Sequence, residues 1–503
     1  MNKLHRLTIA LMATACLCPV AEAQKVVILA TNDTHSQIDP ASDGLGGVLR
    51  RRAAIDQVRR DNKNVLVLDA GDDVQGTLYF SLYKGAVEYA CLDSIGFDMT
   101  TMGNHEFDNG MASLAKNYAK MRTPKVSTNY DASATPLAGL LQPYIIKAVG
   151  DKRVGIFAVN VNPKGLIADN NWTGLVCHNA FDVADATAKY LKEVQKVDFV
   201  TMVSHLGYDN PDPSEPCDSV LLTRSHYIDL VVSAHTHTMI KPGSPMNKVR
   251  NADGRMITIG QNGKSGKYIG RYDVDLATGN VDYSQIKLDS SLDAAAAQYT
   301  AMKAWLAQFS LGVDSLMNTP VATSARAMRG DSPAFQNWIS DATMEILRDL
   351  SGQKIDFAIM NKGGIRQDMP KGDVSEGLIN SIFPFNNRFM VIDVTGQQLL
   401  DALKVMTRRG GDAISKELKV VYKGNSIVSA KVNGKNVTPK ATYTMATIDY
   451  LANGGDYMTS LKSAKRLWVD DKPYSVHVLN YVKGLTAKGK KIDATDEVRM
   501  MQK

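Results

Sequence analysis

The sequence has few cysteines, no long apolar run and no block of like charges, and each absence excludes a class of protein. Five cysteines in 503 residues make neither a disulfide scaffold nor a thiolate metal site. No segment offers the 18 or more uninterrupted apolar residues of a membrane span. The 58 basic and 52 acidic residues form no long run of one sign, so duplex nucleic acid is not the expected partner.

Enough apolar residues remain for large cores, because 44% of the chain is hydrophobic. This composition is that of an ordinary globular protein and excludes a disordered or collagen-like chain. The chain is several times longer than a usual domain of about 100 to 200 residues, so two or three domains are expected.

The N-terminus has the pattern of an export signal. Lys3 and Arg6 precede an apolar stretch from Leu7 to Val20, which is followed by Ala21-Glu22-Ala23. This pattern predicts a signal peptide that is cut after Ala23, and hence a periplasmic or secreted protein. Cys16 offers an alternative, since a lipoprotein signal would be cut before it and leave a lipid anchor.

Cleavage after Ala23 leaves three cysteines, Cys91, Cys177 and Cys217. Cys177 and Cys217 can pair in an oxidising compartment, but three scattered cysteines do not fix a connectivity. The sequence leaves that disulfide open.

Short β-rich runs alternate with helix-length segments from Val26 onward, which predicts an α/β domain. The runs are Val26–Ala30, Val65–Leu68, Val154–Val159, Phe199–Val203 and Leu230–Ser233. Polar motifs follow four of them: Thr31 to His35, Asp69 to Asp72, Ser204-His205 and Ala234 to His237. Open α/β sheets place their sites at the carboxyl ends of strands, so these motifs mark a site.

A change of composition near residue 290 separates two parts of the chain. The segment from Leu292 to Leu311 is rich in Ala and Gln and predicts a linking helix. A second α/β pattern follows, with a helix over Phe335–Leu350. It continues with strands near Ile355–Met360, Met390–Val394 and Leu418–Tyr422. This second part is large enough to have its own core.

Five of the nine histidines lie in the polar motifs, and they are the strongest functional signal in the sequence. They are His35, His105, His205, His235 and His237, accompanied by Asp33, Asp72 and Asn104. Carboxylate, imidazole and amide donors together suit two divalent cations such as zinc, manganese or iron, of which zinc and manganese are favoured. An isolated histidine is usually an ordinary core or surface residue, and His178, His226 and His477 are interpreted in that way.

These blocks, in this order, resemble the calcineurin-type metallophosphoesterases. Two motifs of the second part narrow the resemblance to the bacterial periplasmic 5'-nucleotidase and UDP-sugar hydrolase family. They are Asn361 to Arg366, with the sequence Asn-Lys-Gly-Gly-Ile-Arg, and Tyr450 to Asp456, with the sequence Tyr-Leu-Ala-Asn-Gly-Gly-Asp. The resemblance covers essentially the whole chain after the signal peptide.

The resemblance implies an α/β protein of two domains. A signal peptide over residues 1–23 would precede a four-layer calcineurin-like metallophosphoesterase sandwich over 24–290. A linker helix over 291–315 would lead to a 5'-nucleotidase C-terminal α/β substrate-binding domain over 316–503. In the family the second domain reorients between open and closed states, which would place the hinge near residues 290 to 320.

The resemblance also implies a role for each metal ligand. Asp33, His35 and His237 would hold one ion, Asn104, His205 and His235 the other, and Asp72 would bridge them. Two such ions can activate a water and clamp an in-line displacement at phosphorus, so the implied nucleophile is a metal-bound hydroxide.

His105 would face the phosphate, and Asp108 would pair with it and favour its charged form. In this position His105 would stabilise the transition state or protonate the leaving oxygen. Asp108 has an alternative role as the cap of a following helix.

On the substrate side the resemblance implies that Arg366 binds phosphate and that two aromatic residues, Phe385 and Tyr450, sandwich the base. Members of the family often have Phe where this chain has Tyr450, which adds a hydroxyl. Asn361 and Asp456 would lie near the ribose or base. Arg329 matches a further binding arginine, with Arg326 as the nearby alternative.

The function that the resemblance implies is release of phosphate from nucleoside 5'-phosphates in nucleotide catabolism, with nucleoside di- or triphosphates or nucleotide sugars as further substrates. A 2',3'-cyclic-nucleotide 2'-phosphodiesterase with 3'-nucleotidase activity has the same metal ligands and layout. A non-catalytic exported nucleotide-binding protein is an alternative of another class. Loss of metal ligands would mark it, and this sequence keeps them all.

Overall fold

The computed structural model describes residues 24–210 and 215–503. The signal peptide and Cys16, predicted from residues 1–23, lie outside the described residues. Within the described part, no helix is both long and apolar enough to cross a bilayer. Cys91, Cys177 and Cys217 are all free thiols, so the disulfide that the sequence left open is not formed.

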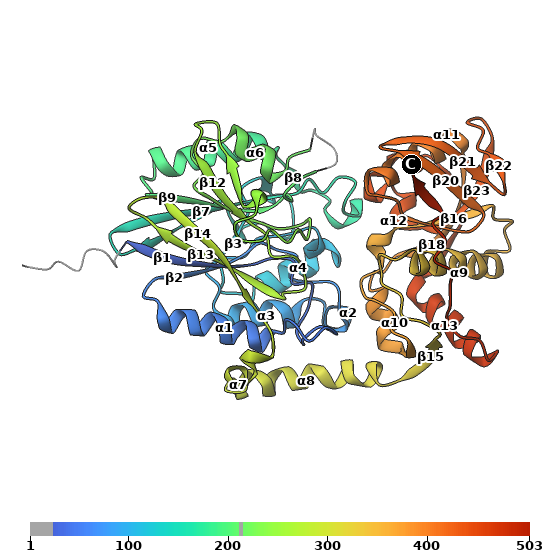
Figure 1. The fold of residues 1–503 in the computed structure, drawn as a ribbon, viewed down its shortest axis with the longest axis horizontal. Helices are drawn as coiled ribbons and strands as arrows, with labels where there is room; N and C mark the ends of the chain where they lie inside the picture. Colours follow the sequence, from blue (N-terminus) through green and yellow to red (C-terminus); the bar gives the residue numbers. More distant parts are fainter. Residues whose placement is uncertain (1–23, 211–214) are drawn as a thin grey trace, which may run out of the picture.

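The first part of the chain contains two large sheets (Figure 1). The first has the strand order β14-β13-β1-β2, with β1 (Lys25–Thr31) parallel to β2 (Val65–Asp69) and antiparallel to β13 (Tyr268–Asp275). Antiparallel pairing joins β13 to the edge strand β14 (Asn280–Lys287). The apolar runs predicted near residues 26 and 65 are therefore neighbouring strands, and the polar ends of both point to the same edge.

The second sheet has the order β11-β12-β10-β9-β7-β6. Its strands are β6 (Tyr144–Val149), β7 (Lys152–Asn160), β9 (Phe199–His205), β10 (Leu230–Ser233), β11 (Lys248–Arg250) and β12 (Met256–Gly260), of which β7, β9, β10 and β12 are parallel. The fully buried carboxylate of Asp218 ties two of them together. It accepts hydrogen bonds of 2.5 Å from Ser204 Oγ on β9 and from Ser233 Oγ on β10.

Helices cover the outer face of each sheet, which gives four layers. The helices α1 (Val48–Asp61), α3 (Ala86–Ile95) and α4 (Gly110–Tyr118) pack on the first sheet, and α5 (Ala180–Glu193) and α6 (Asp218–Arg224) on the second. A third core of strand residues, including Ile28 and Val203, fills the space between the sheets. The predicted α/β fold with a four-layer sandwich is confirmed.

The predicted linking helix is broken into two pieces, α7 (Asp293–Ala296) and α8 (Thr300–Met317). The break lies at Tyr299, whose hydroxyl donates to Asp56 Oδ2 at 2.8 Å and whose ring packs under the guanidinium of Arg52. Three buried residues, Met302, Leu306 and Val313, then seat α8 on the core of the first part. Figure 1 shows α8 running from the first part to the second.

The second part has its own core and three sheets, of which one is a single pair of strands, β15 (Pro320–Ser324) and β17 (Gly372–Ser375), and two are wider. The larger has the order β19-β16-β23-β18-β24, formed by Ala413–Ile414, Phe357–Met360, Thr442–Ile448, Arg388–Thr395 and Lys465–Pro473. Its helices are α9 (Pro333–Ser351), α10 (Glu376–Ile382), α11 (Gly396–Arg408), α12 (Asp449–Ala452) and α13 (Tyr474–Ala487). A smaller sheet has the order β22-β21-β20-β25, formed by Lys435–Asn436, Ser426–Val432, Leu418–Lys423 and Met500–Gln502. The exact boundaries of the domains stay a prediction.

Candidate active site

Polar side chains gather where the strands of both large sheets in the first part end. Asp33 and His35 follow β1, and Asp72 follows β2. His205 is the last residue of β9, and His235 and His237 follow β10. Because these strands are parallel within each sheet, their carboxyl ends meet at one edge and bring the polar residues together.

At this edge several residues have a positive φ, a backbone conformation that residues other than glycine rarely adopt. Asp33, His35, Asp72, His235 and His237 all have φ between 47° and 76°. Each such residue costs about 1 to 3 kcal/mol and persists only where the surrounding structure imposes it. Five of the seven predicted metal ligands are therefore held by strained turns, which aim their side chains inward.

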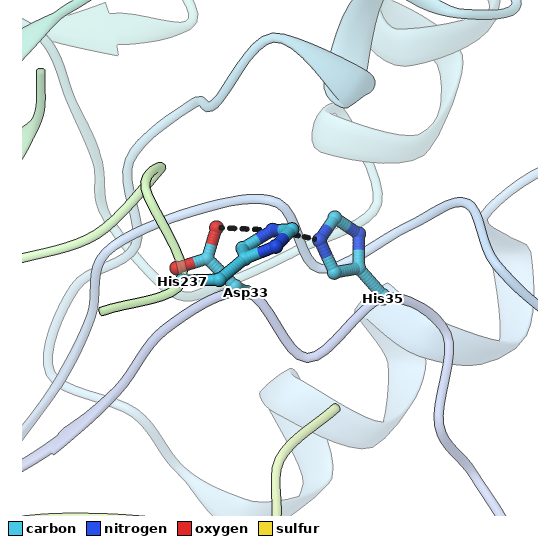
Figure 2. Close-up of side chains that lie close together, drawn as sticks. All are labelled: Asp33, His35 and His237. Atoms are coloured by element: carbon cyan, nitrogen blue, oxygen red, sulfur yellow. Dashed lines mark hydrogen bonds and ion pairs between the residues drawn. The ribbon is translucent and has the colours of Figure 1, made fainter. Parts of the chain in front are cut away.

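The first group of potential ligands is Asp33, His35 and His237, shown in Figure 2. Their ligand atoms all lie within 4.8 Å of one another. The Nε2 atoms of His35 and His237 are 2.9 Å apart, and His237 Nε2 lies 3.7 Å from Asp33 Oδ1. This arrangement directs two imidazoles and a carboxylate to one point, as a divalent cation requires.

The second group is Asp72, His205 and His235, again with ligand atoms within 4.8 Å of one another. Asn104 joins it, because its Oδ1 lies 2.9 Å from His235 Nδ1. His205 Nδ1 donates to the carbonyl of Ala70 at 2.6 Å, which leaves Nε2 as the nitrogen for a metal. That Nε2 is buried, makes no hydrogen bond of good geometry to any described residue and lies 3.3 Å from Asp72 Oδ2, so the donor set fits an ion.

Gly103 makes room for the second group. A Cβ added to this glycine would lie 2.1 Å from Asp72 Oδ1 and 2.5 Å from the His205 ring. Any larger residue would occupy the space that the ligand atoms share. The glycine is thus part of the site, although it contributes no ligand.

The electrostatics of three of the four ligand histidines agree with metal ligation. Burial lowers the pKa of His35 and His237 well below the usual value and that of His235 to about 3, so these rings stay neutral, as ligands must be. Burial also lowers the pKa of His205, but the Asp72 carboxylate outweighs it and raises the pKa to about 10. The second group therefore attracts positive charge strongly.

Glu106 joins the two loops that supply Asp72 and Asn104. Its buried carboxylate accepts hydrogen bonds from the backbone N–H groups of Asp72 and Asp73, both at 3.0 Å, and of Gly103 at 2.5 Å. We did not identify this role from the sequence, because a residue that binds only backbone N–H groups leaves no pattern of its own. Its position next to His105 was the available signal.

His105 lies beside the ligand groups and is held by Asp108. Its Nδ1 is 2.8 Å from Asp108 Oδ2, and its backbone N–H donates to Asp72 Oδ1 at 2.9 Å. Burial lowers the pKa of His105, but Asp108 and Asp72 together outweigh burial and raise it. The ring lies 5.3 Å from that of His35 and 5.9 Å from that of Phe385, measured between centroids.

A cavity of about 1080 Å³ connects this edge with the second part of the chain. The first part contributes Asp72, Asn104, His105, Asp108, His235 and His237 to its wall, and the second part contributes Asn361, Arg366, Phe385, Tyr450 and Asp456. Asn361 follows β16 and Tyr450 follows β23, which is parallel to β16 and next to it. The carboxyl ends of the two strands lie at the same edge of the sheet, so the two residues lie close together. Arg366 Nη2 lies 3.2 Å from the His35 ring nitrogens, across the boundary.

Asp456 is the centre of a network that the sequence did not reveal. Its Oδ2 accepts from Asn361 Nδ2 at 3.1 Å and pairs with Arg409 Nη1 at 2.9 Å. Its Oδ1 lies 2.9 Å from the Tyr450 hydroxyl oxygen. Arg409 was not predicted, since it acts through Asp456 and does not line the cavity.

The structure does not bring Arg329 to the site. Its side chain is 75% exposed and pairs with Asp331 at 2.8 Å. Neither Arg329 nor the alternative Arg326 lines the cavity in the described part of the chain, since Arg326 pairs with Asp496. Asp331, two residues away, forms an ion pair with the Arg329 guanidinium on the surface. A short sequence match does not reveal such a local partner.

Two family models match the chain. Calcineurin-like phosphoesterase matches residues 26–239, and 5'-nucleotidase, C-terminal domain, matches residues 314–463. The first match contains the seven predicted metal ligands, and the second contains the predicted substrate residues.

Similar proteins combine both parts. A human 5'-nucleotidase is 27% identical over 515 residues, covering 90% of this chain and 88% of that protein. A trifunctional nucleotide phosphoesterase protein of Bacillus subtilis is 26% identical over 86% of this chain, which spans only 32% of that longer protein. The solved structure of a 5'-nucleotidase precursor from Thermus thermophilus is 28% identical, with a TM-score of 0.83 over 95% of this chain and 99% of that one.

Proposed function

This chain belongs to the 5'-nucleotidase family and is a metal-dependent phosphoester hydrolase that acts on nucleotides, and on that premise we propose that it is exported and releases phosphate from nucleoside 5'-phosphates. One observation carries the proposal. Four of the residues suited to hold metal ions, Asp72, Asn104, His235 and His237, line the same cavity as the residues suited to hold a nucleoside, from opposite parts of the chain. A substrate with a phosphate at one end and a base at the other fits this distribution.

We assign Asp33, His35 and His237 to one divalent ion and Asn104, His205 and His235 to the other, with Asp72 between them. Zinc or manganese suits this mixture of carboxylate, imidazole and amide donors. When bound, two such ions lower the pKa of a water and neutralise charge on the phosphate.

His105 is the proton donor of this proposal. Asp108 holds Nδ1, which leaves Nε2 as the nitrogen that serves the substrate. The carboxylate favours the charged imidazolium, which stabilises the charge on the phosphate or gives its proton to the leaving oxygen. Asp108 thus acts by orienting His105.

Arg366 and the aromatic residues position the substrate. The Arg366 guanidinium lies beside His35 and has the planar donors for a bidentate contact with phosphate. Phe385 and Tyr450 offer faces on which a base can stack, worth about 1 to 3 kcal/mol per base. Asn361 lines the same cavity, and the hydrogen bond from its Nδ2 to Asp456 orients its amide toward the nucleoside.

The test is phosphate release by the purified protein, beginning at residue 24, with added manganese or zinc. The substrates are AMP, UMP, ADP, UDP-glucose, 3'-AMP and 2',3'-cyclic AMP. We expect release from the 5'-nucleotides, its loss in excess EDTA and its return when metal is restored. Asp72→Ala should lose metal and activity together, because its carboxylate lies between both groups.

The cyclic and 3'-nucleotides are in the panel because a 2',3'-cyclic-nucleotide 2'-phosphodiesterase with 3'-nucleotidase activity would use the same metal ligands and layout. Activity confined to them would refute the 5'-specificity and support the phosphodiesterase. Binding of nucleotides without any phosphate release in the presence of metal would support a non-catalytic binding protein.

A further inference from the structure

The end of the cavity that holds Tyr450 is walled by the first part of the chain as well as by the second. The segment Gly165–Asn171, which follows β7, contributes all its residues to the cavity lining. We call it the cross-wall. Leu166 is half-buried within it, and Ile167 is anchored in the core of the first part with an exposed fraction of 6%.

Three contacts join the cross-wall to the second part. The Tyr450 hydroxyl lies 3.0 Å from the carbonyl oxygen of Leu166, and the backbone N–H of Tyr457 donates to the carbonyl of Gly165 at 3.1 Å. Lys462 Nζ lies 3.3 Å from Asp169 Oδ2, but both side chains are exposed, so this pair contributes little. Of the three contacts, only the Tyr450 contact is made by a side chain whose ring is proposed to stack on the base.

The proton of the Tyr450 hydroxyl is used within the protein. It has one proton to donate, to Asp456 Oδ1 at 2.9 Å or to Leu166, and it accepts the backbone N–H of Asp456 at 3.1 Å. The hydroxyl therefore does not serve as a donor to a base. It ties the Asn361–Asp456–Arg409 network to the cross-wall.

We propose that the base site is built by both parts of the chain, with the cross-wall as its second side, and that the Tyr450 hydroxyl is the positioning group that holds the cross-wall in place. This inference rests on the proposed function, because it specifies where the nucleoside end of the substrate lies. The apolar Leu166 offers contact to the base, and the Asn170 and Asn171 amides supply donors and acceptors for its edge.

The proposal is tested with Tyr450→Phe, which keeps the stacking ring and removes only the hydroxyl. The matched control is Tyr481→Phe, which removes a hydroxyl that binds Glu345 on the surface of the second part, away from the cavity. The lost hydrogen bond is of a size that changes an equilibrium about 5-fold. We expect the KM for AMP to rise about 5-fold in Tyr450→Phe, with a smaller change in kcat, and to stay unchanged in Tyr481→Phe.

A second readout does not depend on catalysis. Lys164 is exposed and directly precedes the cross-wall, so the rate of tryptic cleavage after it reports release of the segment. In metal-free protein without nucleotide, Tyr450→Phe should be cut there about 5-fold faster than the wild type and the control, and adenosine should protect the wild type more strongly.

Equal cleavage rates and equal KM values for Tyr450→Phe and wild type would overturn the proposal. Faster cleavage with an unchanged KM would also overturn it, since the cross-wall would then lie outside the base site. If the wild type releases no phosphate from AMP, the proposed function fails, while cleavage and adenosine protection still test the cross-wall.

Discussion

Replacing Glu106 by Gln tests whether a side chain that touches no ligand atom sets the metal affinity. Glu106 accepts three backbone N–H groups, two at Oε2 and one at Oε1. A glutamine keeps an oxygen for Asp72 and Gly103 but turns its NH2 group toward the N–H of Asp73. The unsatisfied donor costs about 1 to 3 kcal/mol. Burial and the charge of Asp72 raise the pKa of Glu106 to about 8, so in an assay above that pH the loss of charge assistance weakens each remaining bond by about 1 kcal/mol more.

The total of about 3 to 5 kcal/mol is shared between folding stability and metal binding. Because the strained loop of Asp72 would relax, we expect metal affinity to fall about 10- to 100-fold. The assay is competition with a chelator of known affinity, together with thermal unfolding of the metal-free protein. Glu345→Gln, a surface carboxylate of the second part, is the control. Wild-type metal affinity in Glu106→Gln, even with a lower melting temperature, would refute the reasoning.

Three further variants probe other parts of the site. His105→Ala should retain its metals and lose kcat by about 10² to 10⁴, measured as metal content and phosphate release; unchanged turnover at full occupancy would contradict the proton-donor role. In Gly455→Ala the new Cβ would lie 2.5 Å from the Tyr450 ring, so the ring must move, and the KM for AMP should rise roughly 5- to 100-fold if stacking is lost. Burial raises the pKa of Asp218 to about 7. Between pH 4 and 7 the folded protein therefore keeps a proton that the unfolded chain releases. The free energy of unfolding falls as the pH rises through this window, by about 1.4 kcal/mol per pH unit. The fall in melting temperature of metal-free protein between pH 5 and 8 should shrink in Asp218→Asn; an unchanged pH profile would show that another group is responsible.

Local sequence patterns predicted the strands that lead into the site. All five β-rich runs of the first part are strands, and Phe335–Leu350 lies within α9. These elements are strongly apolar and mostly buried, so their signal is local. The hairpin of β13 and β14 was not predicted, because its sequence is rich in polar residues and its partner β1 lies far away in the chain.

The same distinction applies to the site. The predicted metal ligands carry their chemistry in their side chains, and the structure places them together. Other parts of the site act through backbone groups or through another side chain: Glu106, Arg409 and the cross-wall. Their residue types do not indicate a function, so the sequence alone did not predict them. Arg329 shows the opposite situation, since this arginine near the expected position pairs with Asp331 on the surface in the structure.

The strained turns at Asp33, His35, Asp72, His235 and His237 have a consequence for reading related sequences. Glycine adopts this backbone without strain, so drift without selection would favour glycine, or asparagine, at these five positions. A protein of this fold that no longer needed its ions would gain stability by making those replacements. If related sequences keep aspartate or histidine at these positions, where glycine would fit without strain, selection has acted on the side chain itself. Retention of these side chains distinguishes a working hydrolase from an inactive copy without any alignment of the rest of the chain.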